Sequence, residues 1–204
     1  MYDRFPFIAA GTRDECIEGW SRISKAIHSR ATPNATIVVE CYPGVFLDEV
    51  RRELFAALPG VKFVSTTDLL RPAAEIDRML DPVLGDDPVF GKMNAIELED
   101  FFDPQRLASA RDRAAHPSAA TVILGPGASL VCEQPDFLVY ADMARWEIQM
   151  RQRRNEIGNL GSENFSERAS LKYKRAFFVD WRAADRLKVR LLPKIDLLLD
   201  TNIP

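Results

Sequence analysis

The sequence predicts an α/β fold in three layers, with an open, mostly parallel sheet between helices on both faces. Short apolar runs alternate along the chain with segments of helical periodicity, and this alternation is typical of parallel sheets covered on both sides. The chain has 204 residues, of which 47% are apolar. One core can be built from that material, so we expect residues 1–204 to form a single domain.

The predicted strands are bounded by turn residues. The clearest is ATIVVE, which is continuous and rich in β-branched residues, as expected of a strand buried on both faces. Expected strands cover 35–40, 61–66, the run 120–131 with its Gly-Pro-Gly turn, 136–143, 171–181 and 195–202. The chain stops just after the last of these, and we expect it to be the amino-terminal module of a longer protein.

The predicted helices show apolar residues at three- and four-residue steps. The first runs from Cys16 to Ile27, and Thr12 with Glu15 before it forms a capping-box pattern. The next begins near Val45 and ends at Pro59-Gly60. Further helices are expected within 69–80, 95–102, 104–115, 144–155 and 184–194, with loops at 85–93 and 156–170.

Composition narrows the functional classes. No run of residues is long and apolar enough to span a membrane, so we expect a cytoplasmic protein with no membrane partner. The three cysteines and two histidines are far apart in the sequence, which argues against a metal site. Residues 1–140 carry 14 basic and 21 acidic side chains, whereas residues 141–194 carry 13 basic and 7 acidic ones. A locally basic segment in an acidic chain favours a small anion over nucleic acid.

The strand-turn-helix of 36–58 marks the expected anion site, because ligands of parallel sheets bind where the strands end. Its turn, Glu40-Cys41-Tyr42-Pro43-Gly44, takes the place of a phosphate loop. Aligned with Gly-x-x-x-x-Gly-Lys-Ser/Thr, it has Val45, Phe46 and Leu47 at the second glycine, the lysine and the hydroxyl. We therefore expect the backbone amides of Tyr42 to Val45 to bind an anion. The alternative is that the turn merely reverses the chain.

Charged residues at the other strand ends complete the expected site. Guanidinium groups pair with phosphate oxygens in bidentate fashion, which suits an arginine-rich flap. The expected cationic contacts to phosphate are Arg145, Arg151, Arg153, Arg154, Lys172, Lys174, Arg175 and Arg182. Asp68, Asp142 and Asp180 are expected to bind ligand hydroxyls or a metal, with Asp68 and Asp180 as candidate catalytic bases. A solvated helix pair and simple helix caps are the alternatives.

Five strings carry a resemblance to a known family: ECYPGV, DDPVFGKM, VYADMARWEIQMRQRR, LKYKRAFFVDWRAADRLK and LLLDTN. Together they resemble the amino-terminal portion of bacterial class I mannose-6-phosphate isomerase-like proteins, whose carboxyl-terminal portion is cupin-like. The resemblance covers nearly the whole chain. In that family the metal is held in the cupin barrel by histidines and a carboxylate, a set that this chain lacks.

The order of elements is also similar to that of a uridine-kinase-type nucleoside kinase. The resemblance places a phosphate loop at 40–47, Asp68 after the second strand and an arginine-rich lid at 145–154. It implies a P-loop nucleoside-kinase-like fold with a degenerate phosphate loop.

These observations predict a module of a mannose-6-phosphate isomerase-like protein that binds a sugar phosphate or nucleotide. Its expected partners are that small ligand, the cupin-like domain and a second copy of the chain. An atypical nucleoside or sugar kinase is the first alternative, with Asp68 or Asp180 as base and a lysine from 172–175 as the cation; it alone calls for a cofactor, Mg²⁺ with a nucleotide. A non-catalytic docking domain is the second.

Overall fold

The computed structural model describes residues 16–57 and 60–202, and its centre is a five-stranded sheet. The strands are β1 (Thr36–Cys41), β2 (Lys62–Ser65), β3 (Thr121–Gly125), β4 (Phe137–Asp142) and β5 (Leu197–Asp200). All pair in parallel in the order β2-β3-β1-β4-β5. The predicted capping box of Thr12 and Glu15, and Pro59 of the predicted break, lie outside the described residues.

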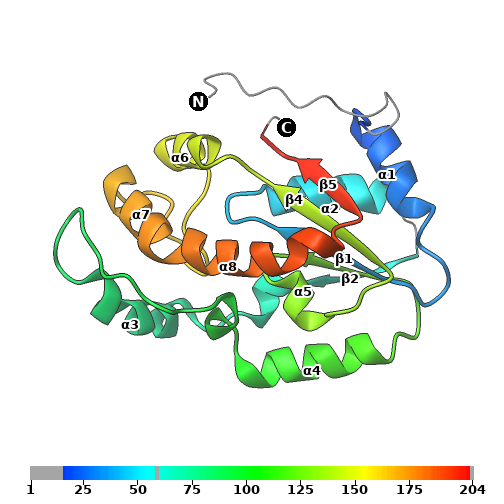
Figure 1. The fold of residues 1–204 in the computed structure, drawn as a ribbon, viewed down its shortest axis with the longest axis horizontal. Coiled ribbons are helices and arrows are strands. Elements are labelled where there is room, and N and C mark those ends of the chain that lie inside the picture. Colours follow the sequence, from blue (N-terminus) through cyan, green and yellow to red (C-terminus); the bar gives the residue numbers. More distant parts are fainter. Residues whose placement is uncertain (1–15, 58–59, 203–204) are drawn as a thin grey trace, which may run out of the picture.

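Helices cover both faces of this sheet, which confirms the predicted three-layer α/β class (Figure 1). The α-helices are α1 (Trp20–His28), α2 (Leu47–Ala57), α3 (Ala73–Leu84), α4 (Pro104–Ala115), α5 (Ala128–Val131), α6 (Arg145–Arg153), α7 (Ala169–Arg175) and α8 (Trp181–Leu191). Short 3-10 turns are η2 (Thr66–Leu69), η3 (Leu98–Phe101) and η5 (Leu192–Lys194), and a π-helical turn, η4, spans Ala176–Asp180. α1 and α2 pack together on one face, and α4, α5 and α8 lie on the other.

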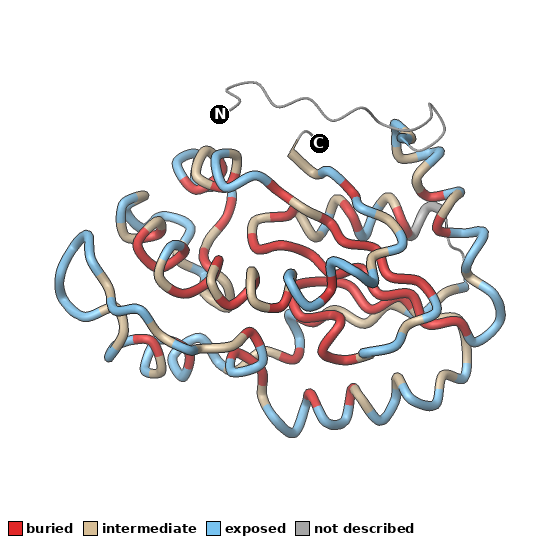
Figure 2. The backbone as a smooth tube through the Cα atoms, in the orientation of Figure 1, coloured by how far each residue is buried: buried red, intermediate tan, exposed pale blue. Residues whose placement is uncertain are grey.

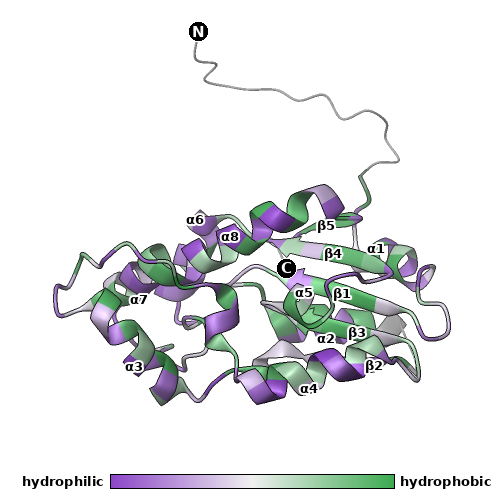
Figure 3. Ribbon diagram, turned by 60° about the horizontal axis from the view of Figure 1, so that its bottom comes forward, coloured by the Kyte–Doolittle hydropathy of each residue, from purple (hydrophilic) through white to green (hydrophobic). Residues whose placement is uncertain are grey.

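The core lies in the central strands. Every residue of β1 is buried, and β4 is buried up to Asp142; Figure 2 shows the strands as the largest continuous buried region. Hydrophobic colouring follows the same strands in Figure 3, while α4 and α6 carry hydrophilic residues. Because apolar side chains fill both faces of the sheet, ligand chemistry is confined to the loops at its carboxyl edge.

The predicted strand at 171–181 is wrong, because this segment is helical throughout α7, η4 and α8. Its aromatic and β-branched residues, such as Phe178 and Val179, favour a strand. The buried positions, however, recur at helical spacing, as Lys172, Ala176 and Val179 show. Charged residues at buried positions concealed this period in the sequence. Because the segment is helical, the sheet has five strands and not the six that were predicted.

Helix boundaries also differ from the prediction: α3 extends to Leu84, and α8 begins at Trp181 and ends at Leu191. The first helix begins at Trp20 after Gly19, whose positive φ of 82° ends the preceding segment. Residues 95–102 contain a single 3-10 turn, η3, in which Glu97 and Asp100 cap each other's backbone. This capping starts the turn, and the extended backbone of Phe102 ends it.

Among the described residues, no helix has the length and apolar character needed to cross a bilayer.

Candidate functional site

The turn after β1 uses most of its own hydrogen-bond donors. The amide of Tyr42 donates to the backbone oxygen of Ala141 (2.9 Å), and that of Val45 donates to Tyr42 (3.2 Å). Pro43 has no amide hydrogen, so Gly44 supplies the remaining donor of the predicted set. A Cβ atom on Gly44 would lie 2.9 Å from Ile148, which shows how closely α6 covers this turn. The geometry does not form the ring of free amides that holds a phosphate.

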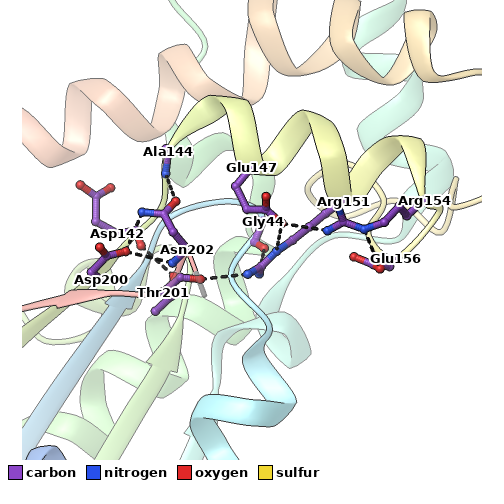
Figure 4. A network of polar contacts seen from close by, with 10 residues as sticks. All are labelled: Gly44, Asp142, Ala144, Glu147, Arg151, Arg154, Glu156, Asp200, Thr201 and Asn202. Atoms are coloured by element: carbon purple, nitrogen blue, oxygen red, sulfur yellow. Dashed lines mark hydrogen bonds and ion pairs between the residues drawn. The ribbon is translucent and has the colours of Figure 1, made fainter. Parts of the chain in front are cut away.

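Arg151 fixes the turn from the other side. Its guanidinium is buried, donates to the backbone oxygens of Gly44 (3.0 Å) and Thr201 (2.9 Å), and lies 3.8 Å from the ring centroid of Phe46. Figure 4 shows the side chain reaching from α6 between these two carbonyls, with Glu147 beside it. The arginine therefore joins three segments that meet at the carboxyl edge.

In the described part of the chain, six of the other predicted cations bond protein oxygens, and the seventh, Arg182, only lies over an aromatic ring. Arg145 pairs with Asp185, Arg153 with the Tyr173 hydroxyl, Arg154 with Glu147 and Glu156, Lys172 with three oxygens, Lys174 with the backbone of Gly85 and Asp87, Arg175 with Asp77 and Leu160, and Arg182 with the ring of Phe177. In this arrangement they connect helices and loops and do not converge on the β1 turn.

Glu40 is buried beneath the same edge. Its carboxylate accepts from the amides of Gly127 (2.6 Å) and Ser129 (2.8 Å) and from the Ser129 hydroxyl (2.8 Å). Burial raises the pKa of Glu40 from 4.5 to about 7, although these hydrogen bonds act in the opposite direction. Gly127 has φ 78°, and a Cβ atom there would lie 2.6 Å from Phe102. The Gly-Pro-Gly turn thus brings α5 close enough to bond β1.

A cavity of about 770 Å³ opens at the carboxyl edge beside the β1 turn. Its walls come from Tyr42–Val45, Thr67, the segment 70–73, Arg106, Pro126, α6, the loop 157–165, and η4 with Trp181. Of the predicted site residues, the cavity includes Tyr42, Pro43, Gly44, Val45 and Asp180. Tyr42 also faces a second, smaller hollow, where its hydroxyl donates to Asp185 (2.8 Å) and which Asp142 and Arg145 line.

Arg71 and Arg106 are the cations on the cavity wall, and neither was predicted. Arg71 donates to the backbone oxygen of Asp100 (3.0 Å), and Arg106 donates to those of Asp68 (3.3 Å) and Leu70 (3.4 Å). An isolated antiparallel bridge between Leu70 and Phe102 brings the two segments together. Arg71 follows the second predicted strand closely, a position that pointed to this edge. Nothing local marks Arg106, which reaches the site by tertiary packing.

Asp180 lies at the inner wall of the cavity, and its side chain is buried. One carboxylate oxygen accepts from the amide of Asn159 (2.7 Å), and Oδ1 has no hydrogen-bond partner within the described part of the chain. Burial raises the pKa of Asp180, while Arg175 and Asn159 act to lower it. The residue lies in the π-helical turn, a distortion that occurs frequently at functional sites.

The other two predicted acids lie away from the cavity wall. Asp68 is exposed in η2, next to Thr67, which does line the cavity. Asp142 pairs with Lys188 (2.5 Å), and its backbone oxygen accepts from Thr201. Across residues 16–57 and 60–202, no group of three or more histidine, cysteine, aspartate or glutamate side chains is arranged to hold a metal.

The fold is similar to those of known kinases. The crystal structure of a protein assigned as a fructose transport system kinase from Silicibacter sp. TM1040 aligns with a TM-score of 0.56 and 13% identity, over 84% of this chain and 95% of that one. A shikimate kinase from Bacteroides thetaiotaomicron aligns with a TM-score of 0.46 and 13% identity, over 82% and 87%. The parallel sheet and the first of these alignments confirm the predicted kinase-like α/β fold, whereas the mannose-6-phosphate isomerase relation gains no support.

No curated protein matches the sequence. The family model described as "Domain of unknown function (DUF8485)" matches residues 19–204. This match covers most of the chain, and the protein therefore belongs to that family.

Proposed function

We propose that this chain is a kinase-like domain that binds a small phosphorylated ligand, a sugar phosphate or a nucleotide, in the cavity at the carboxyl edge of the sheet. The observation that carries the proposal is the pair Arg71 and Arg106 on the cavity wall. Their backbone-directed hydrogen bonds hold both guanidinium groups in place and leave further N–H donors for an anion. The proposed anion site therefore lies between η2 and α4, and not at the β1 turn where the sequence predicted it.

Arg106 is the stronger of the two contacts in this proposal. Among the described residues, its partners are the backbone oxygens of Asp68 and Leu70, with no carboxylate. Arg71 has Glu75 at 3.7 Å, but both side chains are partly exposed and such a pair contributes little. The guanidinium of Arg106 therefore keeps an uncompensated charge, which a phosphate would neutralise.

Thermal unfolding of the full chain tests the proposal. Inorganic phosphate, glucose 6-phosphate and adenosine monophosphate, each at millimolar concentration, serve as probes, and a bound ligand raises Tm. Arg106→Ala is expected to remove the shift. Arg113→Ala is the matched control, because Arg113 lies on the same helix and bonds Ser109 away from the cavity. No shift with any probe, or an equal shift in Arg106→Ala, argues against phosphate binding at this site.

Phosphoryl transfer is a second candidate, favoured by the likeness to a kinase fold. Asp180 would be the base, since it lines the cavity, whereas Asp68 faces solvent. The lysines predicted to replace the missing phosphate-loop lysine already bond protein groups. Lys172 bonds Gln152, Asn155 and Phe165, and Lys174 bonds the 85–87 segment. Arg71 or Arg106 would then have to supply the cation.

Magnesium-dependent consumption of ATP, measured with candidate sugar and nucleoside acceptors, tests this second candidate. Asp180→Asn is expected to abolish turnover while retaining the fold, because the amide replaces the carboxylate with little change of shape. Absence of turnover in the wild-type chain leaves ligand binding as the function.

The relation to mannose-6-phosphate isomerases, the cupin-like partner, the homodimer and the cytoplasmic location stay predictions. Sedimentation of the isolated chain measures the predicted dimerisation, and sedimentation of its mixture with a cupin-like domain measures the predicted association of the two.

A further inference from the structure

The cavity points to a narrower class of ligand than the proposed function requires. We infer that its ligand is an organic anion with an apolar or aromatic body, held by its charged end at Arg71 and Arg106, and not a polyhydroxylated sugar phosphate. This inference rests on the proposed function and specifies its ligand.

Apolar side chains dominate the wall away from the two arginines. The cavity is lined there by Val45, Leu47, Ile148, Ile157, Leu160, Phe165 and Trp181. Phe165 retains 45% of its surface exposed, so an aromatic face is available to a ligand. Contact with such a wall removes apolar surface of the ligand from water, which stabilises the complex by roughly 25 cal/mol per Å².

Two polar side chains of the inner wall are occupied by protein partners, while Ser162 and Glu163 line the wall at the 157–165 loop. Asn159 donates its amide to Lys172 and Asp180 and accepts from Asn164 through its side-chain oxygen. The hydroxyl of Thr67 is paired with that of Ser65 (2.7 Å). A sugar would bring several hydroxyl groups into this space and find few partners for them. Each polar group buried without a partner weakens binding.

Two unpartnered acceptors do not change this balance. They are Oδ1 of Asp180 and Oε1 of Gln152, and both atoms are shielded from solvent behind the cavity surface. Each oxygen has two lone pairs, but a ligand reaches it only if the side chain shifts toward the cavity. These two acceptors suit a few donors on a ring edge and supply no donor for the hydroxyl oxygens of a hexose.

The sheet order separates the charged end of the cavity from its apolar end. Arg71 and Arg106 belong to the segments around η2 and α4, on the β2 side of β1. Ile148 and Trp181 belong to α6 and α8, which follow β4 on the opposite side. The β1 turn lies between them. At about 770 Å³ the cavity falls within the range of roughly 300–1,000 Å³ typical of sites for drug-sized ligands.

Isothermal titration of the full chain with matched probes tests the inference. 1-Naphthyl phosphate is expected to bind at least about tenfold more tightly than glucose 6-phosphate, and 1-naphthol, which lacks the anion, is expected to bind at least about tenfold more weakly than its phosphate ester. Arg106→Ala is expected to reduce the affinity for 1-naphthyl phosphate to that for 1-naphthol.

Phe165→Ser probes the apolar wall. We expect it to weaken 1-naphthyl phosphate binding by about fivefold to tenfold, because half of a phenyl surface is lost, and to leave glucose 6-phosphate unchanged. Phe90→Ser is the control, since Phe90 is 68% exposed and lies outside the cavity wall. Circular dichroism of each variant verifies that it is folded.

The outcomes separate the two proposals. Equal or tighter binding of glucose 6-phosphate overturns the inference and leaves the proposed function standing, as does an unchanged affinity in Phe165→Ser. Failure of every phosphate probe to bind, or binding that Arg106→Ala does not alter, overturns the proposed function and the inference with it.

Discussion

Lys172 is fully enclosed, yet its ammonium has no carboxylate partner among the described residues. It donates instead to the backbone oxygens of Gln152 (2.6 Å) and Phe165 (2.5 Å) and to the side-chain oxygen of Asn155 (2.9 Å). Burial lowers the pKa of Lys172. Three neutral acceptors around one ammonium satisfy its three donors, so the residue holds both ends of the loop 155–165.

Replacement of this lysine is expected to destabilise the fold. Lys172→Met keeps the length of the side chain but leaves three oxygens without a donor, that of Gln152 in a buried contact, which predicts a loss of about 1–3 kcal/mol in the free energy of unfolding. Urea denaturation measures it. Lys194→Met, at an exposed position, is the control and is expected to change stability by less than about 0.5 kcal/mol. Equal stability of both variants contradicts the role given to Lys172.

Glu40 predicts a dependence of stability on pH. Its pKa is about 7 in the folded chain against an ordinary 4.5, so between these values the native state binds a proton that the unfolded state has released. The free energy of unfolding is therefore expected to fall as the pH rises from about 4.5 to about 7 and to level off above. Urea denaturation of wild type and Glu40→Gln across this window measures the difference, which vanishes if Glu40 is not the titrating group.

At the scale of single residues, the sequence indicated the chemistry of the edge but not its partners. Glu40 and Tyr42 were recognised because they lie at the end of a correctly predicted strand, whereas Asp180 was chosen because it lies at the end of the predicted strand 171–181, which is helical. Their contacts, such as that of Glu40 with Gly127, span 87 positions and depend on packing that no local pattern contains. Arg106 was missed for the same reason, since its neighbours at the site lie 36 and 38 positions away.

At the scale of elements, Arg151 connects the β1 turn, α6 and the segment after β5. A lysine in its place has its three donors on one nitrogen and no planar face for Phe46, so it lacks the fixed fork with which the guanidinium bonds Gly44 and Thr201 together. Arg151→Lys is expected to lower stability by about 1–3 kcal/mol. Hydrogen exchange at residues 44–47 and 199–202 is expected to accelerate most.

The control for this variant is Arg153→Lys, on the same helix. Arg153 is exposed and contacts Tyr173 alone among the described residues, so exchange at the carboxyl edge is expected to stay as in the wild type. Uniform acceleration across the whole sheet in Arg151→Lys would show a general loss of stability in place of a local connection.

Elements whose burial follows a simple period were predicted correctly. The strand β1 is continuous and apolar, and α4 shows its apolar positions together with an Asp103 cap whose side chain accepts from two amides. The segment 171–181, which covers most of α7, all of η4 and the first residue of α8, was assigned to a strand because Lys172, Lys174 and Arg175 occupy buried positions normally held by apolar residues. Sequence patterns detect a helix face poorly when charged side chains form it.

At the scale of the whole molecule, most basic side chains of the last quarter of the chain are buried or paired with other protein groups. Arg151, Lys172 and Arg175 are buried, and Arg145 and Arg154 pair with carboxylates. The overall charge of −3 remains for long-range interactions. A duplex of DNA or RNA requires a continuous basic surface, which this charge pattern does not favour.

Fluorescence anisotropy with a labelled DNA duplex at about 50 mM salt checks this consequence, and we expect no binding at micromolar protein. A basic DNA-binding domain of similar size is the positive control. Binding that weakens steeply with added salt would show that the arginines of α6 and α8 are free for phosphate, contrary to the contacts described above.

The hydrogen bonds of Lys172 also affect the free energy of ligand binding in the cavity. Because these hydrogen bonds form during folding, the segment from Asn155 to Phe165 loses its conformational entropy before a ligand binds. Binding then costs only the translational and conformational entropy of the ligand, and no disorder-to-order transition of the protein reduces the affinity. Without the hydrogen bonds of Lys172, each ligand would have to order this loop when it binds.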